Sequence, residues 1–178
     1  MPSPSKKNYF ELFALPCTFD IDLRVLKECY QLLQKNFHPD RYASKPDHEK
    51  RLAMQHATEL NDAYSVLKDP VKRGFYLLSL YQSNEQNLSE EVSIKDPAFL
   101  MQQFELREAL AAIRTLDELL LFIKKTDASI NETIEQLKTE FKEISPKNLS
   151  KIQSILSKIQ FMVKLREEAF LLEEELMG

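Results

Sequence analysis

The sequence predicts an all-α chain organised as two helical domains. Its 178 residues include only two glycines and no tryptophan, which leaves little material for tight β-hairpins or glycine-rich phosphate loops. Apolar residues recur instead at helical spacing, and a hydrophobic content of 43% allows a buried core in each of two small domains. The net charge of −4 argues against a general nucleic-acid-binding protein.

The first long helix is predicted by an apolar stripe at positions i, i+3, i+4, i+7 and i+11. Asp22 can cap its N-terminus. Pro39 must end it at or just before His38, because proline lacks an amide proton and disfavours helical backbone in the residue before it. The residues of the stripe are Leu26, Cys29, Tyr30, Leu33 and Phe37.

The opposite face of this helix is basic. Its residues are Arg24, Lys27, Gln31 and Lys35, and only Glu28 dilutes the charge. An ordinary solvated face has this composition too, because an amphipathic helix needs charge somewhere. The alternative is a binding edge that leads to the loop at His38-Pro39-Asp40.

The next helix is predicted to run from Asp47 or His48 to Lys68 and to pack antiparallel to the first. Its inward face is formed by Leu52, Ala53, Ala57, Leu60, Ala63, Tyr64 and Leu67. Asp69 and Pro70 then provide an N-cap and a first helical residue for a short helix through Tyr81. Residues 82–95 are rich in Gln, Asn, Ser and Glu, which predicts a linker between domains at 1–81 and 96–178.

Three helices are predicted in the second domain. Asp96-Pro97 begins one that extends to about Arg114, and Leu116 to Glu143 forms another with a possible interruption near Asp127. Ser145-Pro146 begins a third that can run to the C-terminus. Short connections between antiparallel helices predict a three-helix bundle.

Two of these helices carry apolar residues away from their core stripes. One stripe consists of Phe99, Leu106, Leu110 and Ile113, and the other of Ile152, Ile155, Leu156, Ile159 and Val163. Leu100, Met101 and Phe104 lie more than about 100° from the first stripe, and Phe161 lies opposite the second. Two interpretations remain open: a core widened by contact with two neighbouring helices, or an exposed docking patch rimmed by Glu105, Arg107 and Glu108.

The order of these motifs resembles a J-domain over residues 8–81. Tyr9-Phe10-Glu11-Leu12 precedes the first long helix, His38-Pro39-Asp40 separates the two long helices, and the segment from Ala63-Tyr64 to Asp69-Pro70-Val71-Lys72-Arg73 closes the pattern. The run from Asp96 to Glu108 is similar to the opening of the C-terminal domain of HscB. The whole chain therefore resembles the HscB family, J-type co-chaperones of iron-sulfur cluster assembly.

The resemblance implies two partners. The J-domain is expected to engage a DnaK-type chaperone, specifically an HscA-like paralogue, and to stimulate its ATPase through His38, Pro39, Asp40, Arg41, Arg24, Lys27, Gln31 and Lys35. The C-terminal bundle is expected to bind and deliver an IscU-type scaffold. Its implied contact residues are Leu100, Met101, Phe104, Glu105, Arg107, Glu108 and Phe161, with Phe104 at a position where the family more usually has leucine.

Other functions are weighed against this one. An enzyme with His38 and Asp40 as an acid-base pair, or a metal held by the three histidines, is disfavoured. A proline separates the first two residues, and neither a nucleophile constellation nor His-x-x-x-His spacing is present. Cys17 and Cys29 fit neither a disulfide framework nor a Cys-x-x-Cys site, so no metal or cofactor is expected.

The expected setting is the bacterial cytoplasm. Residues 1–7 lack the apolar core of a signal peptide, and no apolar run approaches the roughly 20 residues that span a bilayer. We expect a monomer. The alternative is a J-domain co-chaperone for a different client, whose C-terminal bundle serves self-association and buries the second apolar face in a homodimer.

Overall fold

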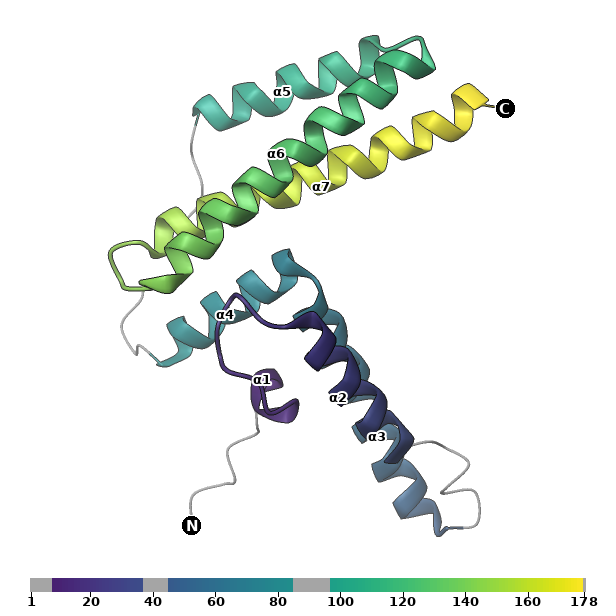
Figure 1. The fold of residues 1–178 in the computed structure, drawn as a ribbon, viewed down its shortest axis with the longest axis vertical. Helices are drawn as coiled ribbons and strands as arrows, with labels where there is room; N and C mark the ends of the chain where they lie inside the picture. Colours follow the sequence, from purple (N-terminus) through teal and green to yellow (C-terminus); the bar gives the residue numbers. More distant parts are fainter. Residues whose placement is uncertain (1–7, 37–44, 85–96, 178) are drawn as a thin grey trace. The chain divides into compact units, whose positions relative to one another are not determined.

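The computed structural model of the chain describes residues 8–36, 45–84 and 97–177. These residues form seven α-helices and no β-strand, which confirms the predicted fold class (Figure 1). The chain divides into two compact units, Met1–Leu80 and Tyr81–Gly178.

In the first unit, α1 (Tyr9–Leu12) is a single turn held against α4 (Pro70–Asn84). The side chain of Asn8 accepts a hydrogen bond from the backbone amide of Glu11, whose carboxylate accepts one from the amide of Asn8. The Tyr9 ring stacks on Tyr76 with 4.5 Å between centroids, and the Tyr9 amide donates to the Tyr76 hydroxyl at 3.0 Å. Burial raises the pKa of the Tyr76 phenol.

The two long helices of this unit, α2 (Leu23–Asn36) and α3 (Asp47–Lys68), form the predicted antiparallel hairpin (Figure 1). The Tyr30 ring stacks on Tyr64 with 4.1 Å between centroids, and the Tyr30 hydroxyl donates to Asn61 Oδ1 at 2.9 Å. Along the α2 stripe Leu26 is fully buried, while the next three stripe residues are half-buried. Phe37 lies outside the described residues.

The inward face of α3 differs from its prediction at one end. Ala53, Leu60, Ala63 and Leu67 are buried as expected, but the Leu52 side chain is 52% exposed. A helix turns by about 100° per residue, which places Leu52 at the edge of the stripe that Ala53 and Leu60 define.

Arg73 joins three segments of this unit. Asp69 caps α4 as predicted, because its Oδ1 accepts the amides of Val71 and Lys72 at 2.8 and 2.9 Å. Arg73, only 6% exposed, donates from Nε to the carbonyl of Phe19 at 2.8 Å and from a terminal guanidinium nitrogen to the carbonyl of Leu67 at 2.6 Å. Its guanidinium carbon lies 5.0 Å from the Phe19 ring centroid. Burial lowers the Arg73 pKa, although Asp20 and Asp69 oppose that change.

The end of α4 also differs from its prediction. The helix continues to Asn84, three residues beyond Tyr81, so positions 82–84 of the predicted linker are helical. The rest of that linker, residues 85–95, lies outside the described residues.

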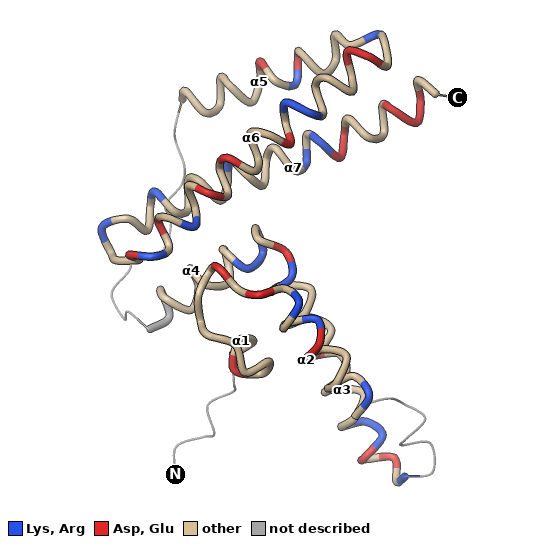
Figure 2. Tube along the Cα trace, in the orientation of Figure 1, with Lys and Arg blue, Asp and Glu red and all other residues tan. Residues whose placement is uncertain are grey.

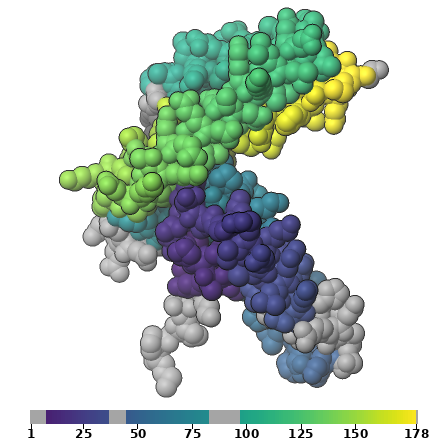
Figure 3. Space-filling view, viewed as in Figure 1, coloured from purple at the N-terminus to yellow at the C-terminus, as the bar shows by residue number. Residues whose placement is uncertain are grey.

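The second unit contains α5 (Pro97–Ala112), α6 (Leu116–Lys142) and α7 (Leu149–Met177), the three predicted helices. α6 is continuous through Asp127, where the sequence allowed an interruption. A capping box begins it, with Thr115 as the N-cap and Glu118 as its partner. The space-filling view shows α7, in yellow, exposed along one edge of α6, in green (Figure 3).

The last helix begins at Leu149 rather than at Pro146. Ser145 to Asn148 form a turn instead, because Asn148 makes the hydrogen bonds that close the connection. Its side-chain oxygen accepts the amide of Ser145 at 2.9 Å, and its side-chain nitrogen donates to the carbonyls of Glu140 and Glu143 at 3.1 and 3.3 Å. The carbonyls of Glu140, in the last turn of α6, and of the C-cap residue Glu143 thereby gain a donor.

Three side-chain pairs fix the antiparallel register of α6 and α7. The Glu140 carboxylate accepts Lys151 Nζ at 2.6 Å, the Ser129 hydroxyl donates to Met162 Sδ at 3.2 Å, and Asp127 Oδ1 accepts an Arg166 guanidinium nitrogen at 2.9 Å. Between these pairs lies part of the core, where Leu137, Ile152, Leu156 and Ile159 are fully buried, and Leu119 extends it beyond the Asp127–Arg166 pair.

Candidate functional site

The basic row predicted on α2 is exposed along its whole length. The side chains of Arg24, Lys27, Gln31 and Lys35 are all exposed, and their three- and four-residue intervals place them on one face. Figure 2 shows where Lys and Arg fall along the chain, in blue. His38, Pro39, Asp40 and Arg41, which follow this row in the sequence, lie outside the described residues.

The N-terminal end of the row is partly neutralised. Asp22 caps α2 as predicted, because its Oδ1 accepts the amide of Arg24 at 2.8 Å, while its Oδ2 lies 3.3 Å from the Arg24 guanidinium. These hydrogen bonds, that of the Arg24 amide first, lower the pKa of the Asp22 carboxyl. The charge of Arg24 is therefore partly offset by Asp22 at this end of the row.

Two exposed apolar side chains beside this row had no role in the sequence prediction. Val25 and Leu32 are 41% and 65% exposed and, being seven residues apart, lie on the same side of α2. Helical spacing alone places Val25 and Leu32 between the basic row and the buried stripe, so their exposure could have been predicted from the sequence.

Arg73 also had no assigned role beyond its place in the Asp69-Pro70-x-x-Arg73 motif. A basic residue near a helix N-terminus is unfavourable to the helix dipole, and this was the available sign of a specific structural contact. The contact is with the carbonyls of Phe19 and Leu67.

The second candidate surface lies on α5. Leu100, Met101 and Phe104 are 57%, 60% and 59% exposed, whereas Phe99, Leu110 and Ile113 on the core stripe are buried. The helix therefore has two apolar faces, of which one contributes to the core and the other is exposed. Glu105, Arg107 and Glu108 beside the exposed face are exposed as well.

The predicted exposure of Phe161 is wrong. Its side chain is 9% exposed and meets the Phe99 ring edge to face, with 6.0 Å between centroids. The physical reason is that α7 packs against both α6 and α5, so residues on two sides of α7 are buried. For Phe161, the widened core is the correct interpretation.

Arg107 links the exposed face of α5 to α7. Its guanidinium carbon lies 5.7 Å from the Phe161 ring centroid, and a terminal nitrogen lies 3.7 Å from Glu168 Oε1. Phe161 is therefore covered by Arg107 on one side and supports Phe99 on another. It contributes to the α5 surface from beneath.

The described part of the chain offers no metal centre and no membrane span. Within it, no cluster of three or more His, Cys, Asp or Glu side chains is arranged to hold a metal ion. The two cysteines, Cys17 and Cys29, are free thiols. None of the described helices combines the length and the apolar content that crossing a membrane requires.

Comparison with known proteins identifies both units. Residues 8–76 match the DnaJ domain family, and residues 95–169 match the family described as the HSCB C-terminal oligomerisation domain. A co-chaperone protein HscB homolog of Vibrio vulnificus is 38% identical over 172 residues, which cover 96% of this chain and 99% of the relative. The chain belongs to the HscB family of co-chaperones.

Solved structures agree with this assignment. Chaperone HscB from Vibrio cholerae superposes with a TM-score of 0.80 at 34% identity, covering 96% of this chain and 99% of that one. Human co-chaperone protein HscB superposes with a TM-score of 0.82 at 27% identity, covering 96% and 83%. The HscB-like, all-helical fold with a J-domain at its N-terminus is thus confirmed.

Proposed function

We propose that this HscB-family protein is a two-site adaptor of iron-sulfur cluster assembly and transfer in the bacterial cytoplasm. It stimulates the ATPase of an HscA-like, DnaK-type chaperone and delivers an IscU-type scaffold to it, with no catalytic chemistry of its own. The observation that carries the proposal is the presence of two exposed surfaces of different chemistry on separate units: the basic row of α2 and the apolar face of α5.

The chaperone site consists of Arg24, Lys27, Gln31 and Lys35 together with His38, Pro39, Asp40 and Arg41. Lysine side chains on an exposed helix face attract an acidic partner and raise the association rate. A carboxylate at Asp40 can accept charge-assisted hydrogen bonds from a partner arginine, which the amide of asparagine cannot equal. His38 is assigned a contact role rather than proton transfer.

The scaffold site consists of Leu100, Met101 and Phe104, bordered by Glu105, Arg107 and Glu108, with Phe161 as the buried support. An apolar centre with a charged rim is the composition of a protein-docking patch. The exposure of three large apolar side chains on one helix face, each above half, supports this assignment.

Carrying both sites on one chain has a direct consequence for delivery. A scaffold held by α5 meets the chaperone at an effective concentration set by the segment that connects the two units, so joint engagement exceeds either contact alone. Stimulation of the ATPase should therefore be greatest when the scaffold is present.

The test is chaperone ATPase activity measured with and without the scaffold, for an HscA-type and a general DnaK-type chaperone. Asp40→Asn is expected to abolish stimulation while scaffold binding remains, and His38→Gln should behave likewise. Asp40→Asn is the more informative of the two variants because it removes a charge with little change of shape. Unchanged stimulation by Asp40→Asn would remove the basis of the chaperone site.

A second candidate function is favoured by the description of the matching C-terminal family as an oligomerisation domain. In that case the bundle would pair with a second copy, and Leu100, Met101 and Phe104 would be buried in a homodimer of a J-domain co-chaperone for another client. Light scattering separates the two ideas. A monomer that binds the scaffold supports the adaptor, whereas a dimer dissociated by substitutions at these three residues supports self-association.

A further inference from the structure

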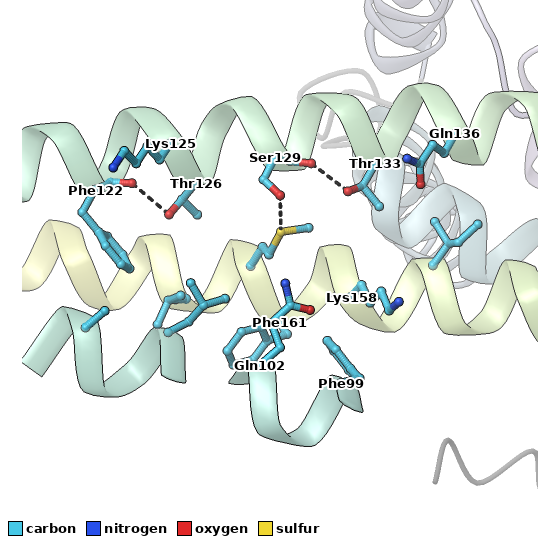
Figure 4. A pocket seen from close by; sticks show the side chains of 15 residues that line it. Phe99, Gln102, Phe122, Lys125, Thr126, Ser129, Thr133, Gln136, Lys158 and Phe161 are labelled. Atoms are coloured by element: carbon cyan, nitrogen blue, oxygen red, sulfur yellow. Dashed lines mark hydrogen bonds between the residues drawn. The ribbon is translucent and has the colours of Figure 1, made fainter. Parts of the chain in front are cut away.

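A groove of about 520 Å³ lies in the second unit, between α5 and α6 with α7 as its floor (Figure 4). This volume falls within the roughly 300–1,000 Å³ of small-molecule sites. The groove shares the buried Phe161 with the proposed scaffold site, but the exposed residues Leu100, Met101 and Phe104 do not line it. α5 packs on α7, and the groove is the space that remains between α5 and α6.

The wall formed by α6 is less polar than its sequence suggests. The hydroxyls of Thr126 and Thr133 donate to the carbonyls of Phe122 and Ser129 at 3.0 and 2.7 Å, and the Ser129 hydroxyl donates to Met162 Sδ at 3.2 Å (Figure 4). Because these donors are engaged within the protein, the three hydroxyl groups offer a ligand no free donor. The floor adds Phe161, Met162 and Leu165, which are buried side chains.

The charged groups of the groove are all cationic. Lys125 lies toward one end, and Lys158 of α7 and Gln136 of α6 both lie toward the other (Figure 4). None of the fifteen lining residues is Asp or Glu, although acidic residues outnumber basic ones between residues 97 and 178. Lys158 Nζ is 5.7 Å from the Phe99 ring centroid, which keeps the ammonium close to the apolar wall formed by α5.

We propose that this groove binds a linear amphiphile with one carboxylate head. The hydrocarbon chain lies along the carbon-lined wall and floor, and the head pairs with Lys158 and accepts a hydrogen bond from Gln136. An ammonium beside apolar surface pairs well with a carboxylate that brings its own apolar chain, because both charges are neutralised at the mouth of the site. A cationic head would face two lysines and no acid.

The test titrates dodecanoate, below its critical micelle concentration, into the full chain. Titration calorimetry measures the affinity for dodecanoate, and changes in the NMR signals of the backbone amides locate the perturbed residues. Saturable binding with perturbations at Ser129, Thr133 and Lys158 is expected. Dodecanol, which lacks the charge, should bind at least about tenfold more weakly.

Two variants and two matched controls complete the design. Lys158→Gln should weaken dodecanoate binding about tenfold, whereas Lys164→Gln, an exposed lysine of α7 outside the groove, should not. Ala109→Phe should block binding by filling the groove. Binding should persist in a variant with serine at positions 100, 101 and 104. Equal affinity for dodecanol, perturbations confined to α5 residues 100–104, or no saturable binding would each overturn the proposal.

Discussion

The exposed face of α5 and the buried Phe161 beneath it can be separated by their effects on stability. Leu100→Ala, Met101→Ala and Phe104→Ala together remove side chains that are 57–60% exposed. Substitutions at such positions usually change the free energy of unfolding by no more than about 0.5 kcal/mol each, so the midpoint of the thermal transition should fall by no more than about 6 °C. Scaffold binding should be lost.

Phe161→Ala should behave differently. Its ring is 9% exposed and packs against Phe99, so truncation should cost about 3–5 kcal/mol. For a domain of about 100 residues this lowers the midpoint by roughly 12 °C or more. Loss of scaffold binding by this variant would then reflect the loss of support for α5 as well as any direct contact.

Calorimetry is the appropriate assay because a chain with two compact units need not unfold in one step. The matched control is a second triple variant, Leu120→Ala with Leu121→Ala and Leu171→Ala, at apolar residues 46–63% exposed on α6 and α7. It should keep both stability and scaffold binding. A triple variant of the α5 face that melts as low as Phe161→Ala, or one that still binds the scaffold, would refute the assignment of that face.

Three further outcomes are expected. The variant Arg24→Glu with Lys27→Glu and Lys35→Glu reverses the charge of the basic row and should associate with the chaperone more slowly than the parent, most strongly at low salt. Association rates measured over a series of salt concentrations check this. An unchanged rate at low salt would mean that the row is only a solvated face. Arg73→Met should destabilise the first unit by roughly 2–4 kcal/mol, because two buried carbonyls lose a charged donor, and a calorimetric transition at the parent's temperature would contradict this. Glu140 has a pKa below its ordinary value of 4.5, chiefly through its hydrogen bond with Lys151, so its contribution to stability is present above that value and lost as pH falls through the folded-state pKa. Urea unfolding measured over a range of pH should therefore show that Glu140→Gln is less stable than the parent near neutral pH and loses less stability on acidification. If the free energy of unfolding of the two proteins changed in parallel with pH, the Glu140–Lys151 ion pair would not be the source of the pH dependence.

The helix boundaries most accurately predicted from sequence were those marked by local chemistry. Asp69-Pro70 ends α3 and begins α4 through the cap on Val71 and Lys72, and Asp22 begins α2 in the same way. These signals depend on residues within one turn, so they can be recognised without the tertiary structure. The start of α7 was missed because Asn148 serves the carbonyls of α6, a contact that depends on how the two helices meet.

The two faces of α5 were predicted correctly from the sequence, whereas the burial of Phe161 was not, for a similar reason. Periodicity alone separated the exposed from the buried face of α5, because α5 packs mainly on one helix, α7. The same reasoning failed for Phe161, because α7 has two neighbours, and a single stripe does not describe a helix that is buried on two sides. The groove between α5 and α6 was not predicted at all, since its existence depends on the spacing between helices rather than on any sequence pattern.

The three cross-links between α6 and α7 restrict where the chain can change length. Ser129 and Glu140 lie eleven positions apart, as do their partners Lys151 and Met162. One residue inserted in either helix between them would turn one end by about 100° and shift it by about 1.5 Å relative to the other, so one pair would have to break. Insertions and deletions should therefore be tolerated between residues 143 and 145 of the connection, or as equal changes of about seven residues, two helical turns, in both helices.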